Sequence, residues 1–451
     1  MIGTKKYSYW LHSGVFSLLQ RLAVMVFGLA SFFVLARTLS TDQMGVWAHF
    51  LAITANIELI RYAIVKNAFI KYLSVHHAEA NDEITTAALV LNIAVTGIIM
   101  IAIFFFMPYL SAFLKAPELT RTMNIFLFGM ILLIPFSHFE WIQNSRGDFK
   151  GIFAAYMVRQ GSWFLLMLIH LVINKEISLS YLAAYYSIGI LAGNLAAFLF
   201  AKKYLNKRHV FKGEWFMKLW RYGRIIFGSA ISSMTFKNVD QFVVSNLISL
   251  TAVAFYNTSL RIINLLDMPS QVIGDIMFPK SAVVSSSNNK ERLKELYEKS
   301  VGAVLSIVIP AALVILLFPK FLLLILAGNK YTGAAYIVRL MLINSIFTVF
   351  IKQFATIMDS SGKAKINLLV ITIMAILAIG FCYFFTKAYG LTGAVMGITA
   401  THIVGMAISQ YFLYRHYNVK FWNAFKYMIT FYPEMFKVIK ERLNLKWNTN
   451  S

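Results

Sequence analysis

The residues of this chain best suited to chemistry are arginines placed deep inside long apolar stretches. Arg21 lies roughly 12 to 16 Å along the first stretch if that stretch is helical, and Arg261 lies at a similar depth in the eighth. An isolated ion at mid-membrane costs at least about 2.5 to 3.5 kcal/mol, so such residues need partners or water. Neither arginine has an acidic neighbour at helical spacing. We therefore expect both to line a cavity, where they favour an anionic cargo.

Two oppositely charged pairs also lie within apolar stretches. Glu58 and Arg61 are three residues apart, as are Lys237 and Asp240, so each pair shares one face of its helix. Each pair could form a salt bridge within one half of the chain or take part in transport, and the sequence leaves both interpretations open. Arg159, in the fifth stretch, is expected to hold the first half together.

Acidic residues of the eighth stretch are candidates for ion coupling. Asp267 and Asp275 are two helical turns apart and are predicted to share a face with Asn264 and Gln271. They could bind a coupling ion or act as counter-ions, although Asp275 is near enough to the end of the stretch to be solvated.

These residues must be positioned by helices that cross a membrane. The chain has 451 residues, of which 59% are hydrophobic and 14% are charged, whereas soluble domains carry about 25% charged residues. Each stretch can cross about 30 Å of hydrocarbon, where a helix satisfies its own backbone. The sequence predicts an all-α polytopic membrane protein with about 12 transmembrane helices. The predicted spans are 12–36, 46–66, 85–107, 122–141, 151–173, 180–201, 223–249, 253–277, 300–318, 336–356, 366–386 and 391–414.

Basic residues lie mainly in alternate loops. With the N-terminus inside, the inner segments carry about four times as many Lys and Arg as the outer loops, which places both termini in the cytoplasm by the positive-inside rule. The net charge of +23 is therefore interpreted as membrane topology and not as nucleic-acid binding.

Several chemistries are not expected. The single cysteine, Cys382, lies inside an apolar stretch, so there is neither a disulfide framework nor a thiolate metal site. Ser361, Gly362 and Lys363 look like part of a phosphate loop but lack the upstream glycines. No loop is large enough to hold a catalytic domain. We expect a transporter and not an enzyme, with no metal and no cofactor other than a coupling proton or sodium ion.

A basic segment divides the chain into two similar halves. The predicted divisions are an N-terminal lobe (1–201), a basic cytoplasmic linker (202–222), a C-terminal lobe (223–414) and a basic amphipathic tail (415–451). An offset of 209 residues aligns Ser40 with Ser249, Trp47 with Tyr256, Glu58 with Asp267, and Lys71 with Lys280. Because six spans return the chain to the same side, the halves would be parallel repeats, as in transporters with alternating access. A chance alignment of similar helix pairs is the alternative.

The tail mixes aromatic and basic residues, and its apolar run is too short to cross a bilayer. We expect an amphipathic helix on the anionic inner leaflet, with a solvated tail as the alternative.

Four segments carry a resemblance to a known family. They are 32–45 (FFVLARTLSTDQMG), 237–241 (KNVDQ), 254–262 (AFYNTSLRI) and 360–365 (SSGKAK). In this order, with twelve spans and both termini inside, the chain resembles the polysaccharide and lipid-linked oligosaccharide flippases of the MOP superfamily, the Wzx-like exporters of O-antigen and capsule repeat units. The resemblance implies two six-helix lobes around a central cavity that opens alternately to each side.

The resemblance also implies roles for particular residues. Arg21 and Arg261 would bind the diphosphate of an undecaprenyl-linked oligosaccharide, and Asp240 matches the family's acidic position on span seven. The full substrate-binding set is Arg21, Arg61, Arg261, Asn257 and Gln241, with Asn56 and Trp47 as further contacts for sugar hydroxyls. The candidates for ion coupling or counter-ions are Glu58, Asp240, Asp267 and Lys237.

Other functions remain as alternatives. A multidrug antiporter of the same superfamily would need an acidic, aromatic pocket for cations. A membrane polymerase or ligase would need a long outer loop, and a purely structural scaffold would give buried charges little reason to exist. The expected partners are lipid-linked oligosaccharide, membrane lipids and other polysaccharide-assembly membrane proteins, without nucleic acid. The expected location is a bacterial inner membrane.

Overall fold

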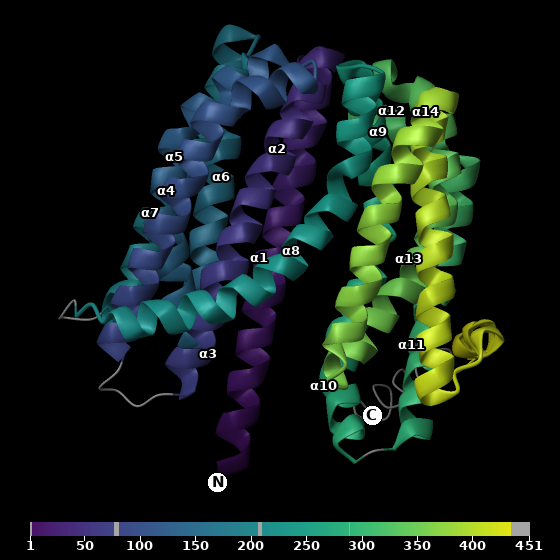
Figure 1. The fold of residues 1–451 in the computed structure, drawn as a ribbon. Coiled ribbons are helices and arrows are strands. Elements are labelled where there is room, and N and C mark those ends of the chain that lie inside the picture. Colours follow the sequence, from purple (N-terminus) through teal and green to yellow (C-terminus); the bar gives the residue numbers. More distant parts are fainter. Residues whose placement is uncertain (1, 76–80, 206–209, 288, 434–451) are drawn as a thin grey trace, which may run out of the picture. The chain divides into compact units, whose positions relative to one another are not determined.

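The computed structural model describes residues 2–75, 81–205, 210–287 and 289–433, and every regular element in these ranges is helical (Figure 1). The helices are α1 (Ile2–Thr38), α2 (Thr41–Arg61), η1 (Tyr62–Lys66), α3 (Asn67–Val75), α4 (Asn81–Phe113), α5 (Pro117–Ser145), α6 (Phe149–Asn174), α7 (Leu179–Ala201), η3 (Lys202–Tyr204), α8 (Gly213–Leu247), α9 (Leu250–Leu265), α10 (Met268–Ser286), α11 (Lys290–Leu317), α12 (Pro319–Ala327), η4 (Asn329–Ala334), α13 (Ala335–Ser360) and α14 (Ala364–Tyr417).

The helices account for the predicted spans and confirm a polytopic membrane protein. In the described part of the chain, nine helical segments are long and apolar enough to cross a membrane. One of them, α14, contains the last two predicted spans. The seventh predicted span corresponds to α8, and the eighth corresponds to α9 together with α10. Charged and polar side chains interrupt the apolar sequence of these three helices.

The helix α14 is a hairpin of two helices folded at Gly390, whose φ of 58° lies in the left-handed region that glycine tolerates. Its arms pack closely through small residues. A Cβ on Gly393 would overlap the carbonyl oxygen of Phe385, and one on Gly397 would meet the backbone of Cys382. The contact partner moves from Phe385 back to Cys382 as the chain advances from Gly393 to Gly397, so the two arms are antiparallel. The boundary predicted between 386 and 391 is confirmed.

The eighth predicted span, 253–277, is not one continuous helix. The structure ends α9 at Leu265 and begins α10 at Met268, with Pro269 in the first turn of α10. Proline lacks an N–H and its ring clashes with the carbonyl four residues earlier, which disfavours a continuous helix here, whereas proline suits the first turn of a new helix. Asp267 lies at this break, immediately before α10.

The chain forms two compact units. The first comprises residues up to Met234 together with Ser249–Ala254, and the second comprises Thr235–Ile248 and the described residues from Phe255 onward. In the first unit α5 packs on α4 and α7, and α6 packs on α7 and α1. In the second unit α13 packs on α10, α11 and α14.

The two units divide inside α8, later in the chain than the expected linker 202–222. The first turns of α8 belong to the first unit because Trp215 and Leu219 are buried in the same cluster as Phe69 and Trp141. Glu83 on α4 accepts a hydrogen bond from Trp215 Nε1 at 3.0 Å. The part of the predicted linker from Gly213 onward is thus helical and packs on the first unit.

Candidate functional site

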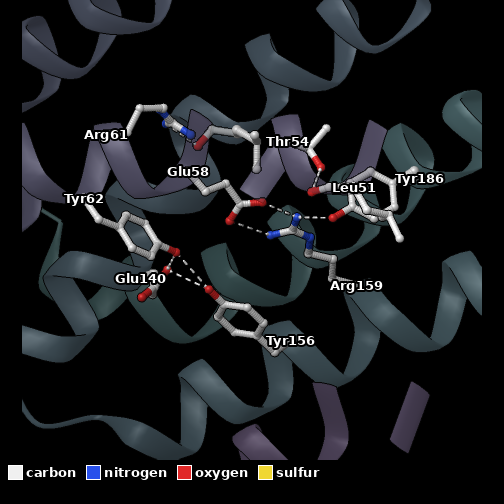
Figure 2. A network of polar contacts seen from close by, with 10 residues as sticks. Leu51, Thr54, Glu58, Arg61, Tyr62, Glu140, Tyr156, Arg159 and Tyr186 are labelled. Atoms are coloured by element: carbon white, nitrogen blue, oxygen red, sulfur yellow. Dashed lines mark hydrogen bonds and ion pairs between the residues drawn. The ribbon is translucent and has the colours of Figure 1, made fainter. Parts of the chain in front are cut away.

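The first unit contains a network of charged and polar side chains inside the membrane-spanning helices (Figure 2). Arg159 on α6 donates from Nη2 to Glu58 Oε1 on α2 at 2.7 Å and to the Tyr186 hydroxyl on α7 at 3.3 Å. Arg159 is 4% exposed, and its guanidinium lies 5.0 Å from the centre of the Phe136 ring. Arg159 thus joins helices of the first half, as its position in the sequence predicted.

Glu58 therefore takes its ion-pair partner from another helix and not from Arg61, three residues away. Arg61 is fully buried, and its Nη2 donates to Asn92 Oδ1 at 2.8 Å and to the Leu133 carbonyl at 2.9 Å. The shared helix face brought the two residues near each other, but tertiary packing decided the pairing.

Arg61 belongs to a set of donors that bind three consecutive carbonyls of α5 just before Pro135. Asn194 on α7 donates to the Leu132 carbonyl at 2.7 Å. Asn92 on α4 donates to the Ile134 carbonyl at 3.1 Å, and Arg61 on α2 donates to the carbonyl between them. A proline inside a membrane helix disturbs backbone hydrogen bonding, and neighbouring helices commonly supply donors there.

A second carboxylate, Glu140 on α5, gathers three donors. It accepts from Lys66 Nζ at 2.7 Å, from the Tyr62 hydroxyl at 2.9 Å and from the Tyr156 hydroxyl at 3.1 Å. Tyr62 and Lys66 lie on η1, a short π-helical turn that continues α2. Such turns occur frequently at functional sites. We did not predict a role for Glu140 from the sequence, although it lies inside the predicted span 122–141.

The first predicted cation of the site, Arg21, lies on α1 in the first unit and is exposed. Arg261 lies on α9 in the second unit and is half-buried. Trp47, predicted as a sugar contact, is only 1% exposed because it stacks on Phe50 and Trp163. Its ring belongs to a packed aromatic core, and a sugar contact for Trp47 stays a prediction.

In the second unit, Asp240 on α8 is bound by neutral donors. It is 5% exposed and accepts from the Tyr256 hydroxyl at 2.7 Å and from the Gln241 backbone N–H at 2.8 Å. The side chains of Gln241 and Asn257 are joined by a hydrogen bond of 3.0 Å between α8 and α9. Three predicted site residues, Asp240, Gln241 and Asn257, are thus brought together.

Asp267 forms an ion pair with Lys352 on α13. Lys237 on α8 interacts electrostatically with both of these residues. Asp275 is exposed on α10. Lys352 lies near the end of the predicted span 336–356, and we did not predict it as a partner of Asp267.

No group of three or more His, Cys, Asp or Glu side chains in the described residues is placed to hold a metal ion. The charged clusters instead contain an excess of cations. Arg61, Lys66 and Arg159 outnumber Glu58 and Glu140 in the first unit. In the second unit, Lys237 and Lys352 outnumber Asp267.

The chain matches a protein-family model over most of its length. The family described as "Polysaccharide biosynthesis protein" matches residues 34–336, about two thirds of the chain.

Three curated proteins are similar in sequence. An uncharacterized membrane protein of Methanocaldococcus jannaschii is 22% identical over 82% of this chain and 77% of its own length. A Shigella flexneri protein named "Putative O-antigen transporter" is 26% identical over 45% of this chain and 48% of its own length. A "Probable low-salt glycan biosynthesis flippase" of Haloferax volcanii is 20% identical over 45% of this chain and 43% of its own length. The last two matches each cover less than half of either protein.

Two of the solved structures that share the fold have the same TM-score. An inward-facing multidrug resistance transporter of the MATE family, in the MOP superfamily, has a TM-score of 0.76 at 15% identity, covering 87% of this chain and 94% of its own. The lipid II flippase MurJ in an inward closed conformation has a TM-score of 0.76 at 14% identity, covering 95% of this chain and 92% of its own. These likenesses establish the fold that was predicted from the sequence.

Proposed function

Because this chain belongs to the polysaccharide biosynthesis protein family, we propose that it is a flippase for lipid-linked oligosaccharide. It would move an undecaprenyl-diphosphate-linked repeat unit from the inner to the outer leaflet of a bacterial cytoplasmic membrane, for assembly of a surface polysaccharide such as O-antigen. Two sequence relatives described as an O-antigen transporter and a glycan biosynthesis flippase support this function. Both termini would be cytoplasmic.

The observation that carries the proposal is the excess of positive charge within the membrane-spanning helices. Each unit contains a cluster with one more cation than anion, and Arg21 and Arg261 are further cations, one in each unit. Cations at this depth are costly, and a diphosphate crossing a low-dielectric path needs compensating positive charge. Arg21 and Arg261 would bind the diphosphate through forked donors, while the polyprenyl tail stays in lipid.

The hydrogen-bonded amides Gln241 and Asn257 would bind sugar hydroxyls. Arg61 would act on the substrate through its electrostatic field and not by direct contact. It is fully buried and contributes positive charge to the first unit. Glu58 and Asp267 would serve as counter-ions that keep the net charge of each cluster small, and Lys237 would serve as a counter-ion to Asp267. Alternating access by two parallel six-helix lobes would carry the cargo across.

Coupling to a proton gradient would use Asp240. Glu58, Glu140 and Asp267 each pair with a cation, whereas Asp240 accepts its hydrogen bonds from a phenol and a backbone N–H. A buried carboxylate with neutral partners can gain or lose a proton more readily than one held by a cation. Asp240→Asn should therefore uncouple transport from the gradient.

The proposal is tested in a strain lacking this protein, complemented with the wild type, Arg21→Ala, Arg261→Ala or the exposed control Arg146→Ala. The deletion should accumulate lipid-linked oligosaccharide and lose surface glycan. The wild type and Arg146→Ala should restore it. Each loss of a charged hydrogen bond costs about 1.5 to 3 kcal/mol, so Arg21→Ala and Arg261→Ala should each lower export by about ten- to a hundredfold. Unchanged glycan with new sensitivity to cationic drugs would instead identify a multidrug antiporter.

A further inference from the structure

The helical segment 421–433, which follows α14, is seated firmly on the second unit and forms the yellow helix at the right of Figure 1. Its start is held by Glu298 on α11, which is 2% exposed and accepts from the Lys420 backbone N–H and from Asn423 Nδ2, both at 3.0 Å. A carboxylate at this position also matches the positive end of the helix dipole.

The body of the segment packs on α11 and α13. A Cβ on Gly302 would lie 2.7 Å from Tyr427 Cβ, so the two helices approach to backbone distance. The Phe350 ring lies 5.0 Å from the Phe421 ring, and the Tyr432 hydroxyl donates to the Ser306 carbonyl at 2.6 Å.

These contacts place the segment at the level of the membrane surface. The charged residues of α11 end at Lys299, and the rest of the helix, 300–317, contains none. The segment meets α11 at Glu298 in the charged part and at Gly302 and Ser306 in the apolar part, so it lies across the boundary between them. This boundary is where a membrane helix leaves the headgroup region.

The surface of the segment that faces away from α11 has three different parts. Trp422 is 76% exposed and Ile429 is 66% exposed, and at roughly 100° per residue they project within about 20° of each other. Lys426 lies about 40° from Trp422 by the same count, and Thr430 lies about 80° from Trp422, on the side away from Phe421. An apolar flank and a basic edge thus lie beside a polar face.

We propose that the segment 421–433 is a peripheral anchor that binds an anionic lipid surface through Trp422, Ile429 and Lys426. The tail sequence favours a lipid surface as the occupant. Residues 415–451 contain seven Lys or Arg and two Glu, and basic segments bind anionic leaflets while tryptophan prefers the interface. The sequence predicted a helix lying on the leaflet, but the structure adds that one face is committed to α11, so lipid binding at this segment acts on a membrane-spanning helix.

The test relies on site-specific labelling, which is simple because the chain has a single cysteine to remove. In a Cys382→Ala background of the full-length protein, one cysteine replaces Ile429, and a matched control replaces Thr430 on the polar face. Each is labelled with an environment-sensitive fluorophore in vesicles of phosphatidylcholine and phosphatidylglycerol in equal amounts. Quenching is measured with brominated lipid and with aqueous iodide.

The anchor predicts that brominated lipid quenches the label at 429 several times more strongly than the label at 430, with the opposite order for iodide. Lys426→Glu, or vesicles of phosphatidylcholine alone, should reduce lipid quenching at 429. Iodide quenching at 429 equal to that at 430 would overturn the proposal, as would shielding of 429 from both quenchers, which would indicate a protein occupant. Trp422→Cys repeats the measurement on the same face if Ile429→Cys fails to fold.

Discussion

At the scale of residues, the charges inside the first unit are held by partners from several helices. Glu58 and Arg159 are about a hundred positions apart in the sequence, and their side chains form an ion pair at 2.7 Å. Sequence spacing predicted that Glu58 would be near Arg61 but could not reveal Arg159, because the contact depends on how α2 and α6 pack. The same limit explains why Glu140 and Lys352 were missed, since an isolated charge near a span end looks like a loop residue.

Removing Arg159 should be strongly destabilising. Arg159→Ala takes away the nearest cation of Glu58, and breaking one side of a buried ion pair costs about 3 to 5 kcal/mol. The double variant Glu58→Gln with Arg159→Gln should lose less, because no buried charge is left without its partner. Thermal unfolding in detergent measures both, with exposed Arg146→Ala as the control. If Arg159→Ala unfolds at the wild-type temperature, Glu58 does not depend on this pair.

A second residue-scale prediction concerns Asp148, the N-cap of α6 outside the spans. Partial burial alone would raise its pKa, but hydrogen bonds from Lys203, the Gly151 backbone and Tyr204 hold the pKa below its ordinary value of 3.8. A carboxyl with a lowered folded-state pKa stabilises the protein above the unfolded-state pKa, and this stabilisation is lost as pH falls through the lowered pKa.

Asp148→Asn preserves a capping side chain and removes the charge. The variant should be less stable than the wild type at neutral pH, by about 1 kcal/mol or less because Lys203 is exposed. The difference in unfolding temperature should shrink as acid protonates Asp148. A difference that stays constant from neutral to acidic pH would show that the charge contributes nothing.

At the scale of elements, apolar length predicted the spans, while breaks and turns required local backbone chemistry. The hairpin fold of α14 follows from Gly390 in the left-handed region. The division between α9 and α10 follows from Pro269, a signal present in the sequence that span length concealed. The start of α8 was expected to be a linker because it is basic, but Trp215 and Leu219 give it a buried face.

The close packing of the α14 hairpin gives a prediction with an internal control. Gly393→Ala would place a methyl group against the Phe385 carbonyl, whereas a methyl group added at Gly380 in the same hairpin would have no atom within 4 Å. Gly393→Ala should cost about 1 to 3 kcal/mol. Gly380→Ala should be neutral or stabilise by up to about 1 kcal/mol. Equal effects on the unfolding temperature would rule out close contact between the arms.

At the scale of the whole molecule, the two halves repeat local environments as well as residue types. The aligned pairs are N-capping serines (Ser40 and Ser249), buried aromatics (Trp47 and Tyr256), carboxylates ion-paired to another helix (Glu58 and Asp267) and exposed lysines (Lys71 and Lys280). Four agreements in environment are difficult to obtain from a chance alignment. They favour a parallel repeat, which is one of the arrangements found in transporters with alternating access.

The proposal that this chain moves lipid-linked oligosaccharide is tested most directly by reconstitution. Purified protein is placed in vesicles containing an undecaprenyl-diphosphate-linked oligosaccharide, and a glycosidase outside the vesicles reports how much glycan reaches the outer leaflet with time. We expect complete digestion with the wild type and digestion limited to the initially exposed leaflet in protein-free vesicles or with the double variant Arg21→Ala, Arg261→Ala. Digestion by the wild type that stops at the same limit as in protein-free vesicles would contradict flippase activity.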